Sequence, residues 1–249
     1  NYKMDTFKVL SFGSFSEIYL SKNEGENKKI LRSYAGNYLK EEIRAEALVR
    51  NLDSFSRFFN ETSSYVAEFV DFTKMSTRAK ISRHAIPRYF EILEDTLVGD
   101  RLNYFNSIDH GIDLIKHPKF YFFDNGVYNA LLSNFTASLD RIGKLSEQLV
   151  FSQIKHSSWA QDKEIKISSF RTRSGVEVDF IVEMDQSLYA IEVKTNEHII
   201  SDDLVGLQFF DKAISQKKKL FIFHMGKNEK KQGNIWILPW QKGLQEIGL

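Results

Sequence analysis

The sequence predicts an α/β (α+β) protein, in which a helical N-terminal part precedes a mixed β-sheet flanked by helices. Within residues 30–72, apolar side chains recur at spacings of three and four, which is the period of one helix face. After Pro118 the pattern changes to short apolar strands that alternate with helical segments, as in a sheet with helices packed on it. This change predicts two domains, residues 1–116 and residues 117–249.

Hydrophobic periodicity also predicts the remaining elements. In chain order, they are a short helix or strand in 7–20, a surface loop in 21–29, helices in 30–72, a strand in 120–124, helices in 127–135 and 142–159, a strand in 165–170, a hairpin in 171–195, a helix in 204–214, and strands in 220–225 and 235–238.

Composition limits the possible functions. Lys and Arg (34 residues) nearly balance Asp and Glu (33 residues), so any nucleic-acid binding has to come from local patches. The absence of cysteine excludes disulfides and thiolate metal sites and fits a cytoplasmic protein. No apolar run approaches the roughly 18 residues that span a membrane, so no membrane partner is expected. The chain begins with Asn1, and we expect it to be a fragment of a longer protein.

Residues 82–100 have the spacing of apolar residues that is expected for the second helix of a helix-turn-helix. Ser82 is a suitable N-cap, and Arg83, His84 and Arg88 would then be exposed for contact with DNA phosphates or bases. Pro87 strains an early turn, so the helix is expected to begin later than Ser82. A small helical packing module without DNA contact is an equally supported alternative.

Residues 171–194, with the sequence RTRSGVEVDFIVEMDQSLYAIEVK, predict a β-hairpin. The two halves, residues 176–183 and 188–195, alternate apolar and polar side chains with the period of two that a half-buried strand has. The alternation lapses at residues 184–187, which places the turn there.

The turn decides which polar side chains oppose each other. If it is centred within residues 184–187, Asp179 faces Glu192 and Glu177 faces Lys194, whereas a loop of odd length would break this register. Directly opposed Cβ atoms lie about 4.5–5.5 Å apart, so the two carboxylates repel unless a cation neutralises them. The alternative is a solvent-exposed face on which Glu177 and Lys194 form an ordinary ion pair.

Glu147 adds a third carboxylate near the start of the helix predicted for residues 142–159. We expect Glu147, Asp179 and Glu192 to hold one or two Mg²⁺ (or Mn²⁺) ions, because oxygen ligands suit a hard cation. Such an ion polarises a phosphodiester and lowers the pKa of a bound water molecule. Lys194 would orient that water molecule or balance the developing charge.

The segments EVDF and IEVK, preceded by KLSEQLVF, resemble the motif of the PD-(D/E)XK nuclease superfamily. Asp179 matches its first acidic residue, Glu192-Val193-Lys194 its (D/E)XK, and Glu147 the helix glutamate that many members have. The resemblance implies a restriction-endonuclease-like fold and a Mg²⁺-dependent DNA endonuclease. Its catalytic residues would be Asp179, Glu192, Lys194 and Glu147.

A wider resemblance covers nearly the whole chain. FYFFDNGVYNALL, GKLSEQLVF and FRTRSGVEVDFIV are similar to the C-terminal region of an uncharacterised prokaryotic AAA+ ATPase family, in which a winged-helix-like segment precedes the nuclease-like domain. SRHAIPRYFEILEDTLVGDRL resembles its recognition-helix region, and FGSFSEIY resembles the segment that joins it to the ATPase. Two residues depart from the family pattern: Ser16, where proline is usual, and Pro87.

That resemblance implies an AAA+ ATPase module upstream in the full-length protein. Gly143-Lys144-Leu145 does not replace it, because a phosphate-binding loop needs an earlier glycine and a Ser or Thr after the lysine. No ATPase activity is expected from this chain.

Local basic residues are the candidates for DNA contact. Arg171 and Arg173 precede the acidic strand and could grip the DNA backbone, as could Arg83 and Arg88 in the N-terminal part. The lysines of residues 217–219 and 227–231 are interpreted as solvated.

Two functions follow from the sequence. The first is the metal-dependent DNA endonuclease. The alternative is a catalytically inactive nuclease-like module that binds DNA or a protein and regulates the ATPase. The first is favoured because all four motif residues are present.

Overall fold

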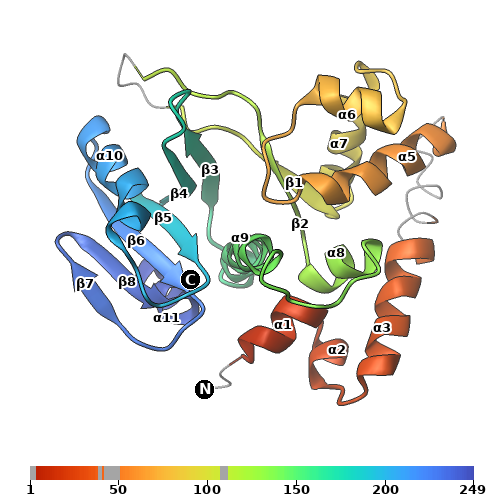
Figure 1. Cartoon of the computed structure of the whole chain (residues 1–249), viewed down its shortest axis with the longest axis horizontal. Helices are drawn as coiled ribbons and strands as arrows, with labels where there is room; N and C mark the ends of the chain where they lie inside the picture. Colours follow the sequence, from red (N-terminus) through yellow and green to blue (C-terminus); the bar gives the residue numbers. More distant parts are fainter. Residues whose placement is uncertain (1–3, 39–40, 42–50, 107–111) are drawn as a thin grey trace. The chain divides into compact units, whose positions relative to one another are not determined.

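The computed structural model describes residues 4–38, 41, 51–106 and 112–249 (Figure 1). The chain forms two compact units. Unit 1 consists of Asn1–Arg101 and Lys119–Leu149, and unit 2 consists of Leu102–Pro118 and Val150–Leu249. Helices, a two-stranded sheet and a six-stranded mixed sheet confirm the predicted α/β (α+β) class. The chain passes between the units after Arg101, after Pro118 and after Leu149. The predicted division into residues 1–116 and 117–249 stays a prediction.

Unit 1 begins with three helices that are joined to a fourth through a buried aspartate. These helices are α1 (Thr6–Phe12), α2 (Ser16–Leu20), α3 (Glu24–Ser33) and α8 (Asn125–Leu131). Asp124 caps α8 by accepting hydrogen bonds from the backbone N–H groups of Gly126 (2.7 Å) and Val127 (3.2 Å), and it also accepts one from Ser14 N (2.7 Å). Burial raises the pKa of Asp124. Gly13 is required at this joint, because its φ is +78° and a Cβ there would lie 2.0 Å from Asp124 Oδ1.

The other part of unit 1 packs three helices against a two-stranded sheet through aromatic rings. The elements are α5 (Leu52–Thr62), α6 (Phe72–Ala79), α7 (Ala85–Asp95), β1 (Gly99–Leu102) and β2 (Lys119–Phe122). The ring of Phe90 on α7 lies 4.8 Å from that of Phe58 on α5 and 5.2 Å from that of Phe120 on β2, centroid to centroid. Such pairs add to the stabilisation that comes from area burial alone.

Helix α7 confirms the later start that Pro87 predicted. The helix begins at Ala85, so Pro87 lies in its first turn, where backbone N–H groups have no partner within the helix. Ser82 is therefore not the N-cap, a position that His84 occupies without a side-chain hydrogen bond.

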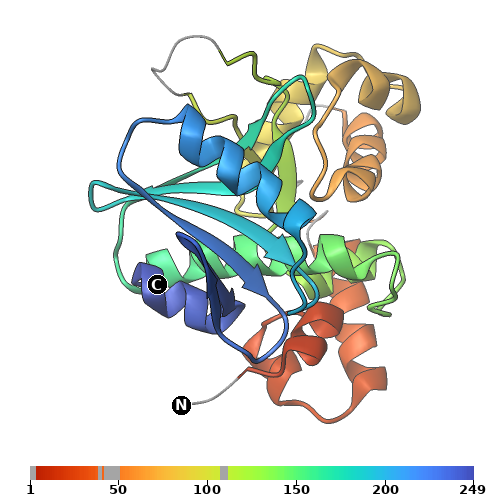
Figure 2. The same ribbon diagram turned by 60° about the vertical axis from the view of Figure 1, so that its left-hand side comes forward.

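Unit 2 is built on a six-stranded mixed sheet in the order β3-β4-β5-β6-β8-β7 (Figure 2). Its strands are β3 (Ile165–Arg171), β4 (Glu177–Met184), β5 (Ser187–Lys194), β6 (Lys218–His224), β7 (Lys230–Gln232) and β8 (Ile235–Pro239). β3, β4 and β5 are antiparallel neighbours, while β5, β6 and β8 run parallel. The parallel step from β5 to β6 needs a crossover, which α10 provides.

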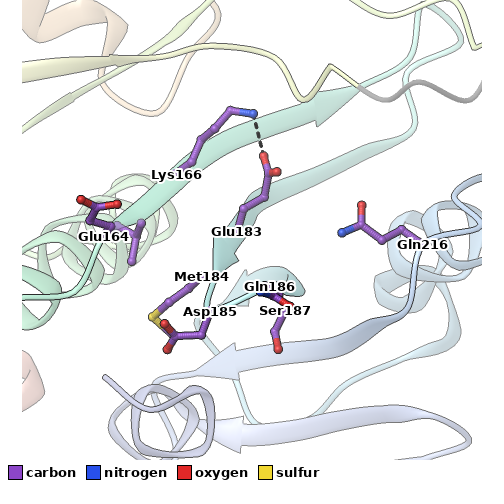
Figure 3. A pocket seen from close by; sticks show the side chains of 9 residues that line it. Glu164, Lys166, Glu183, Met184, Asp185, Gln186, Ser187 and Gln216 are labelled. Carbon is purple, nitrogen blue, oxygen red and sulfur yellow. Dashed lines mark ion pairs between the residues drawn. The ribbon is translucent and has the colours of Figure 1, made fainter.

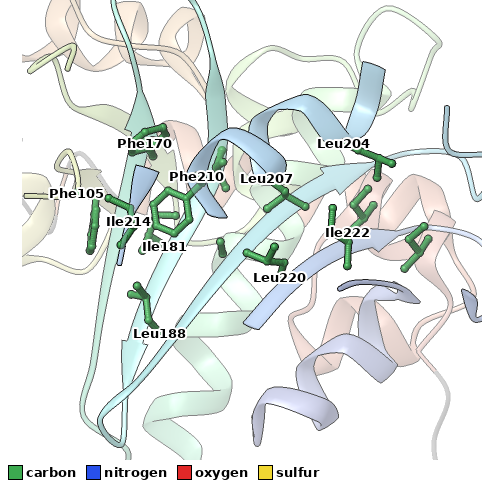
Figure 4. Close-up of a cluster of buried hydrophobic side chains, with 14 residues drawn as sticks. Phe105, Phe170, Ile181, Leu188, Leu204, Leu207, Phe210, Ile214, Leu220 and Ile222 are labelled. Carbon is green, nitrogen blue, oxygen red and sulfur yellow. The ribbon is translucent and has the colours of Figure 1, made fainter. Parts of the chain in front are cut away.

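Helices cover both faces of this sheet. A 3₁₀ turn (Ser201–Leu204) leads into α10 (Val205–Ala213), which buries Leu207 and Phe210 against Ile181, Ile222 and other apolar side chains (Figure 4). The opposite face contacts α9 (Ile142–Ala160) through the Phe151–Phe180 ring pair, and α11 (Trp240–Ile247) at Phe223. Ile222 and Phe223 thus point to opposite sides, as adjacent strand residues must.

The β4–β5 hairpin has the register that the sequence predicts. The backbone pairs run from Met184–Ser187 to Phe180–Ile191, so the turn contains only Asp185 and Gln186. Both turn residues have a positive φ, +49° and +59°, as in the type I′ turns that suit hairpin twist. Figure 3 shows this turn together with the Lys166–Glu183 ion pair (2.8 Å), which joins β3 and β4 nearby.

No helix of the described residues is both long enough and apolar enough to cross a membrane.

Gly206 fixes α10 directly on strand β4. A Cβ at this position would lie 2.0 Å from the backbone oxygen of Glu177. Neither a helix backbone nor the sheet can yield by that amount without repacking, so only glycine permits this approach.

We predict that Gly206→Ala lowers the free energy of unfolding by about 1–3 kcal/mol, because the clash outweighs the better helix propensity of alanine. Gly143 in α9 is the matched control, because a Cβ there meets nothing within 4 Å. Gly143→Ala should raise stability by up to about 1 kcal/mol. Urea unfolding of both variants measures the difference, and equal effects at the two glycines would contradict the close approach.

Candidate active site

Asp179 and Glu192 lie at the point where the backbone pairing of strands β4 and β5 ends. The predicted Asp179–Glu192 pair is one step beyond the last backbone pair, Phe180–Ile191. Here Asp179 is 7% exposed and its Oδ2 accepts a hydrogen bond from Val193 N at 2.9 Å. The carboxylate of Asp179 therefore binds the backbone of β5 and is fixed in place at the end of the hairpin.

Lys194 lies between two carboxylates. Its Nζ is 3.0 Å from Glu192 Oε1 and 3.3 Å from Asp203 Oδ1. Burial acts to lower the pKa of Lys194, but the nearby charges of Glu192, Asp203 and Asp179 together raise it above its ordinary value. The side chain is therefore an ammonium ion at neutral pH, and it can donate hydrogen bonds or balance negative charge.

The solvent-face alternative predicted an ion pair between Glu177 and Lys194, which is not what the structure shows. Lys194 pairs with Glu192 and Asp203, and Glu177 pairs across β3 and β4 with Arg171 at 3.4 Å. Glu177 and Lys194 therefore each pair with other residues and do not form the cross-strand ion pair with each other that this alternative expects.

Glu147 belongs to unit 1, where it accepts hydrogen bonds from two side chains of β2. The ammonium of Lys119 is 2.8 Å from Glu147 Oε1, and the hydroxyl of Tyr121 also donates to that oxygen. Lys119 is only 2% exposed, and its Nζ also lies 5.3 Å from the centroid of the Phe69 ring. The predicted metal set joins Glu147 to two residues of unit 2, and that combination stays a prediction.

The donor chemistry of Asp179 and Glu192 fits a hard divalent cation such as Mg²⁺, because both supply carboxylate oxygens. Across the described ranges, however, no three His, Cys, Asp or Glu side chains are grouped so that they could hold a metal ion. A cation that binds Glu192 would also meet the ammonium of Lys194 at Oε1. A metal ion that binds Glu192 through Oε1 would therefore have to compete with Lys194.

The four arginines that the sequence proposed for DNA contact are all at least partly exposed. Arg171 ends β3, and Arg173 follows in the β3–β4 turn, where it pairs with Asp113 at 3.1 Å. In unit 1, Arg83 precedes α7, and Arg88 pairs with Glu91 at 3.0 Å. Exposed pairs of this kind contribute at most about 1 kcal/mol, so a phosphate could replace them. DNA contact by these residues stays a prediction.

Asp203 is the site residue that sequence reasoning missed. The sequence pattern around Asp203 indicated only the start of a helix. Asp203 does have that role, because its Oδ2 accepts a hydrogen bond from Ile200 N at 2.9 Å. Its approach to Lys194 depends on the path of the chain from β5 into the 3₁₀ turn, which no spacing in the sequence reveals.

His224, the last residue of strand β6, forms hydrogen bonds with the loop that follows this strand. His224 is fully buried and pairs with Lys194 in the β5–β6 register. Its Nδ1 accepts from Gly226 N (3.0 Å), so its Nε2 carries the proton that faces Asn228 O (3.0 Å). Burial lowers the pKa of His224, and Glu197 binds the same loop through Lys227 N and Asn228 N.

Comparison with known proteins finds a family model that matches each of two parts of the chain. Residues 4–138 match the model described as Domain of unknown function (DUF8612), and residues 142–242 match the one described as Domain of unknown function (DUF4143). Because the first match spans more than half of the chain, the protein belongs to the DUF8612 family.

A longer archaeal protein is also similar to this chain. It is Uncharacterized protein MJ1544 of Methanocaldococcus jannaschii, which is 26% identical over 212 residues. The match covers 78% of this chain and 46% of the relative, so the chain spans about half the length of that protein.

The buried neutral His224 predicts a loss of stability on mild acidification. Its pKa is lower in the folded protein than the ordinary 6.5, so the unfolded chain takes up the proton first as the pH falls below about 6.5. The free energy of unfolding should therefore fall between pH 7.5 and 5.5, by at most about 1.4 kcal/mol per pH unit from this group.

Urea unfolding at several pH values measures this effect in the wild type and in His224→Gln. The variant should be less stable at pH 7.5 but should lose less stability on acidification. The same replacement at exposed His198 is the control. An unchanged slope in His224→Gln would contradict the assignment.

Proposed function

We propose that this chain is a Mg²⁺-dependent DNA endonuclease module of the PD-(D/E)XK type, associated with an AAA+ ATPase in the full-length protein. One observation carries the proposal: three of the four motif residues, Asp179, Glu192 and Lys194, lie together at one end of a hairpin, and Lys194 contacts Glu192. Carboxylates with an adjacent ammonium ion form a charge pattern suited to phosphodiester hydrolysis.

Each residue has a defined role in this proposal. Asp179 and Glu192 hold the cation, and Glu147 is the third ligand predicted from the sequence. When bound, the divalent ion supplies Lewis-acid polarisation of the phosphate and a more acidic water molecule. Lys194 donates hydrogen bonds that orient the attacking water or offset the charge that develops on the phosphate. Arg171 and Arg173 would bind the DNA backbone.

Two features of unit 1 support a DNA-binding or linking role for this unit. The helices α6 and α7 follow each other as in a helix-turn-helix, and Arg83, His84 and Arg88 are exposed at the start of α7. The archaeal relative is longer than the part that matches, so an ATPase module in such longer proteins is compatible with the proposal.

A specific observation favours a second candidate, an inactive nuclease-like module that binds DNA or a protein and regulates the ATPase. Both motif glutamates already contact ammonium groups of the protein itself. Lys194 lies 3.0 Å from Glu192, and Lys119 lies 2.8 Å from Glu147. If these lysines replace the metal ion permanently, the fold keeps its charge balance without catalysis.

Titration calorimetry with Mn²⁺ separates the two candidates. Wild type should bind Mn²⁺ saturably, and Asp179→Asn should weaken binding at least about tenfold, because it removes a charged ligand. Asp185→Asn, which changes an exposed carboxylate of the hairpin turn, is the matched control and should bind as wild type does. If wild type gives no saturable heat, the metal site is disproved and the second candidate stands.

Cleavage of supercoiled and branched DNA tests the activity itself. Glu192→Gln and Lys194→Met should each lower the rate by about 100-fold or more, which is the usual effect of removing one group that stabilises a transition state. Glu183→Gln, on the same hairpin and in a residue that pairs with Lys166 near the hairpin turn, should cleave normally. Cleavage that survives both active-site substitutions would come from a contaminant.

A further inference from the structure

The contact between Lys194 and Glu192 creates a problem for the proposed metal site. Lys194 Nζ lies 3.0 Å from Glu192 Oε1. A divalent cation bound to this carboxylate would stand within a few ångströms of the ammonium, and two cations at that distance repel each other strongly in a partly buried site. A cation bound through Oε1 would displace the ammonium from Glu192, and the ammonium would then need another anionic partner to stay near the site.

The two contacts of the Asp203 carboxylate make it suitable as that partner. Its Oδ2 is held by Ile200 N (2.9 Å), while its Oδ1 lies 3.3 Å from Lys194 Nζ. One oxygen therefore fixes the side chain to the backbone, and the other faces the lysine. With 22% of its side chain exposed, Asp203 is more shielded from water than a surface carboxylate, so its attraction for the ammonium is screened less.

The position of Asp203 relative to the hairpin is fixed by packing. Leu204, directly after it, and Leu207 on α10 are buried in the core of unit 2. Gly206 lets α10 touch the backbone of β4 at Glu177, the strand that also carries Asp179. The carboxylate of Asp203 therefore stands at a constant place beside the end of the hairpin, whatever the position of the lysine side chain.

We propose that Asp203 is a positioning residue that holds the Lys194 ammonium beside the site while a divalent cation occupies Glu192. This inference rests on the proposed nuclease function. It assigns Asp203 to the lysine and not to the metal, because Oδ1 of Asp203 lies 3.3 Å from Lys194 Nζ and its Oδ2 accepts a hydrogen bond from Ile200 N. Lys194 thus has two anchors, and the metal ion competes for only one of them.

The structural alternative is that Asp203 serves only to cap the 3₁₀ turn. The substitution Asp203→Asn separates the two roles, because an asparagine oxygen can still accept from Ile200 N but carries no charge for Lys194. A capping role would be preserved in this variant. Asp202, next in the chain and exposed, provides the matched control Asp202→Asn, which removes the same charge from the same turn.

The decisive experiment is a double-mutant cycle on Mn²⁺ affinity, measured by calorimetry. It compares wild type, Asp203→Asn, Lys194→Met and the double variant, with circular dichroism to confirm that each is folded. Asp203→Asn should weaken Mn²⁺ binding about three- to tenfold, because the displaced ammonium loses its second partner. In the Lys194→Met background the same substitution should change affinity by less than about twofold, since no ammonium has to be accommodated.

Two results would overturn the inference. If Asp203→Asn weakens binding equally with and without Lys194, its effect is that of a ligand or of general charge. If it behaves as Asp202→Asn does, the residue has no role beyond the turn. Both differ from failure of the proposed function, in which wild type itself binds no Mn²⁺ and the inference falls with it.

A DNA-cleavage assay at saturating Mn²⁺ gives an independent readout. There the metal site is full in every variant, so Asp203→Asn should lower kcat and leave KM for DNA nearly unchanged, because the mispositioned ammonium acts on the chemical step. An unchanged kcat would contradict the positioning role.

Discussion

The register of the β4–β5 hairpin is the constraint on which the candidate site depends. Its two-residue turn places Asp185 and Gln186 in the left-handed region, and the backbone pairs then follow without a shift as far as Phe180–Ile191. A slip of one residue would turn every side chain of one strand to the other face. Phe180 would then leave the core, and the charged side chains next to it would enter the core unpaired.

Charge balance within each unit is the second constraint. An isolated charge that is removed from water strongly destabilises the folded state, so buried charged side chains need ion-pair or hydrogen-bond partners nearby. In unit 2, Lys194 lies between Glu192 and Asp203, and Asp179 binds a backbone N–H group. The acidic hairpin can therefore fold before any cation is present. In the proposed metal site, a cation at Glu192 Oε1 would have to compete with this lysine.

Local patterns in the sequence predicted the features that depend on neighbouring residues. The alternation of apolar and polar side chains predicted the hairpin, and a turn centred within residues 184–187 predicted its register. The restricted geometry of Pro87 predicted the late start of α7. In contrast, residues 21–29 were expected to form a surface loop, but Asn23 caps a helix that begins at Glu24. Glycine and charge in that segment were outweighed by a good cap and by the burial of one helix face.

Partners that meet through tertiary packing could not be predicted. Nothing near Asp203 in the sequence indicates Lys194, because their contact is made by the crossover from β5 into α10, in which Gly206 lets the helix approach the backbone of β4 closely. Sequence motifs identify the residues that can perform chemistry, while close packing of a helix on a strand decides which of them can act together.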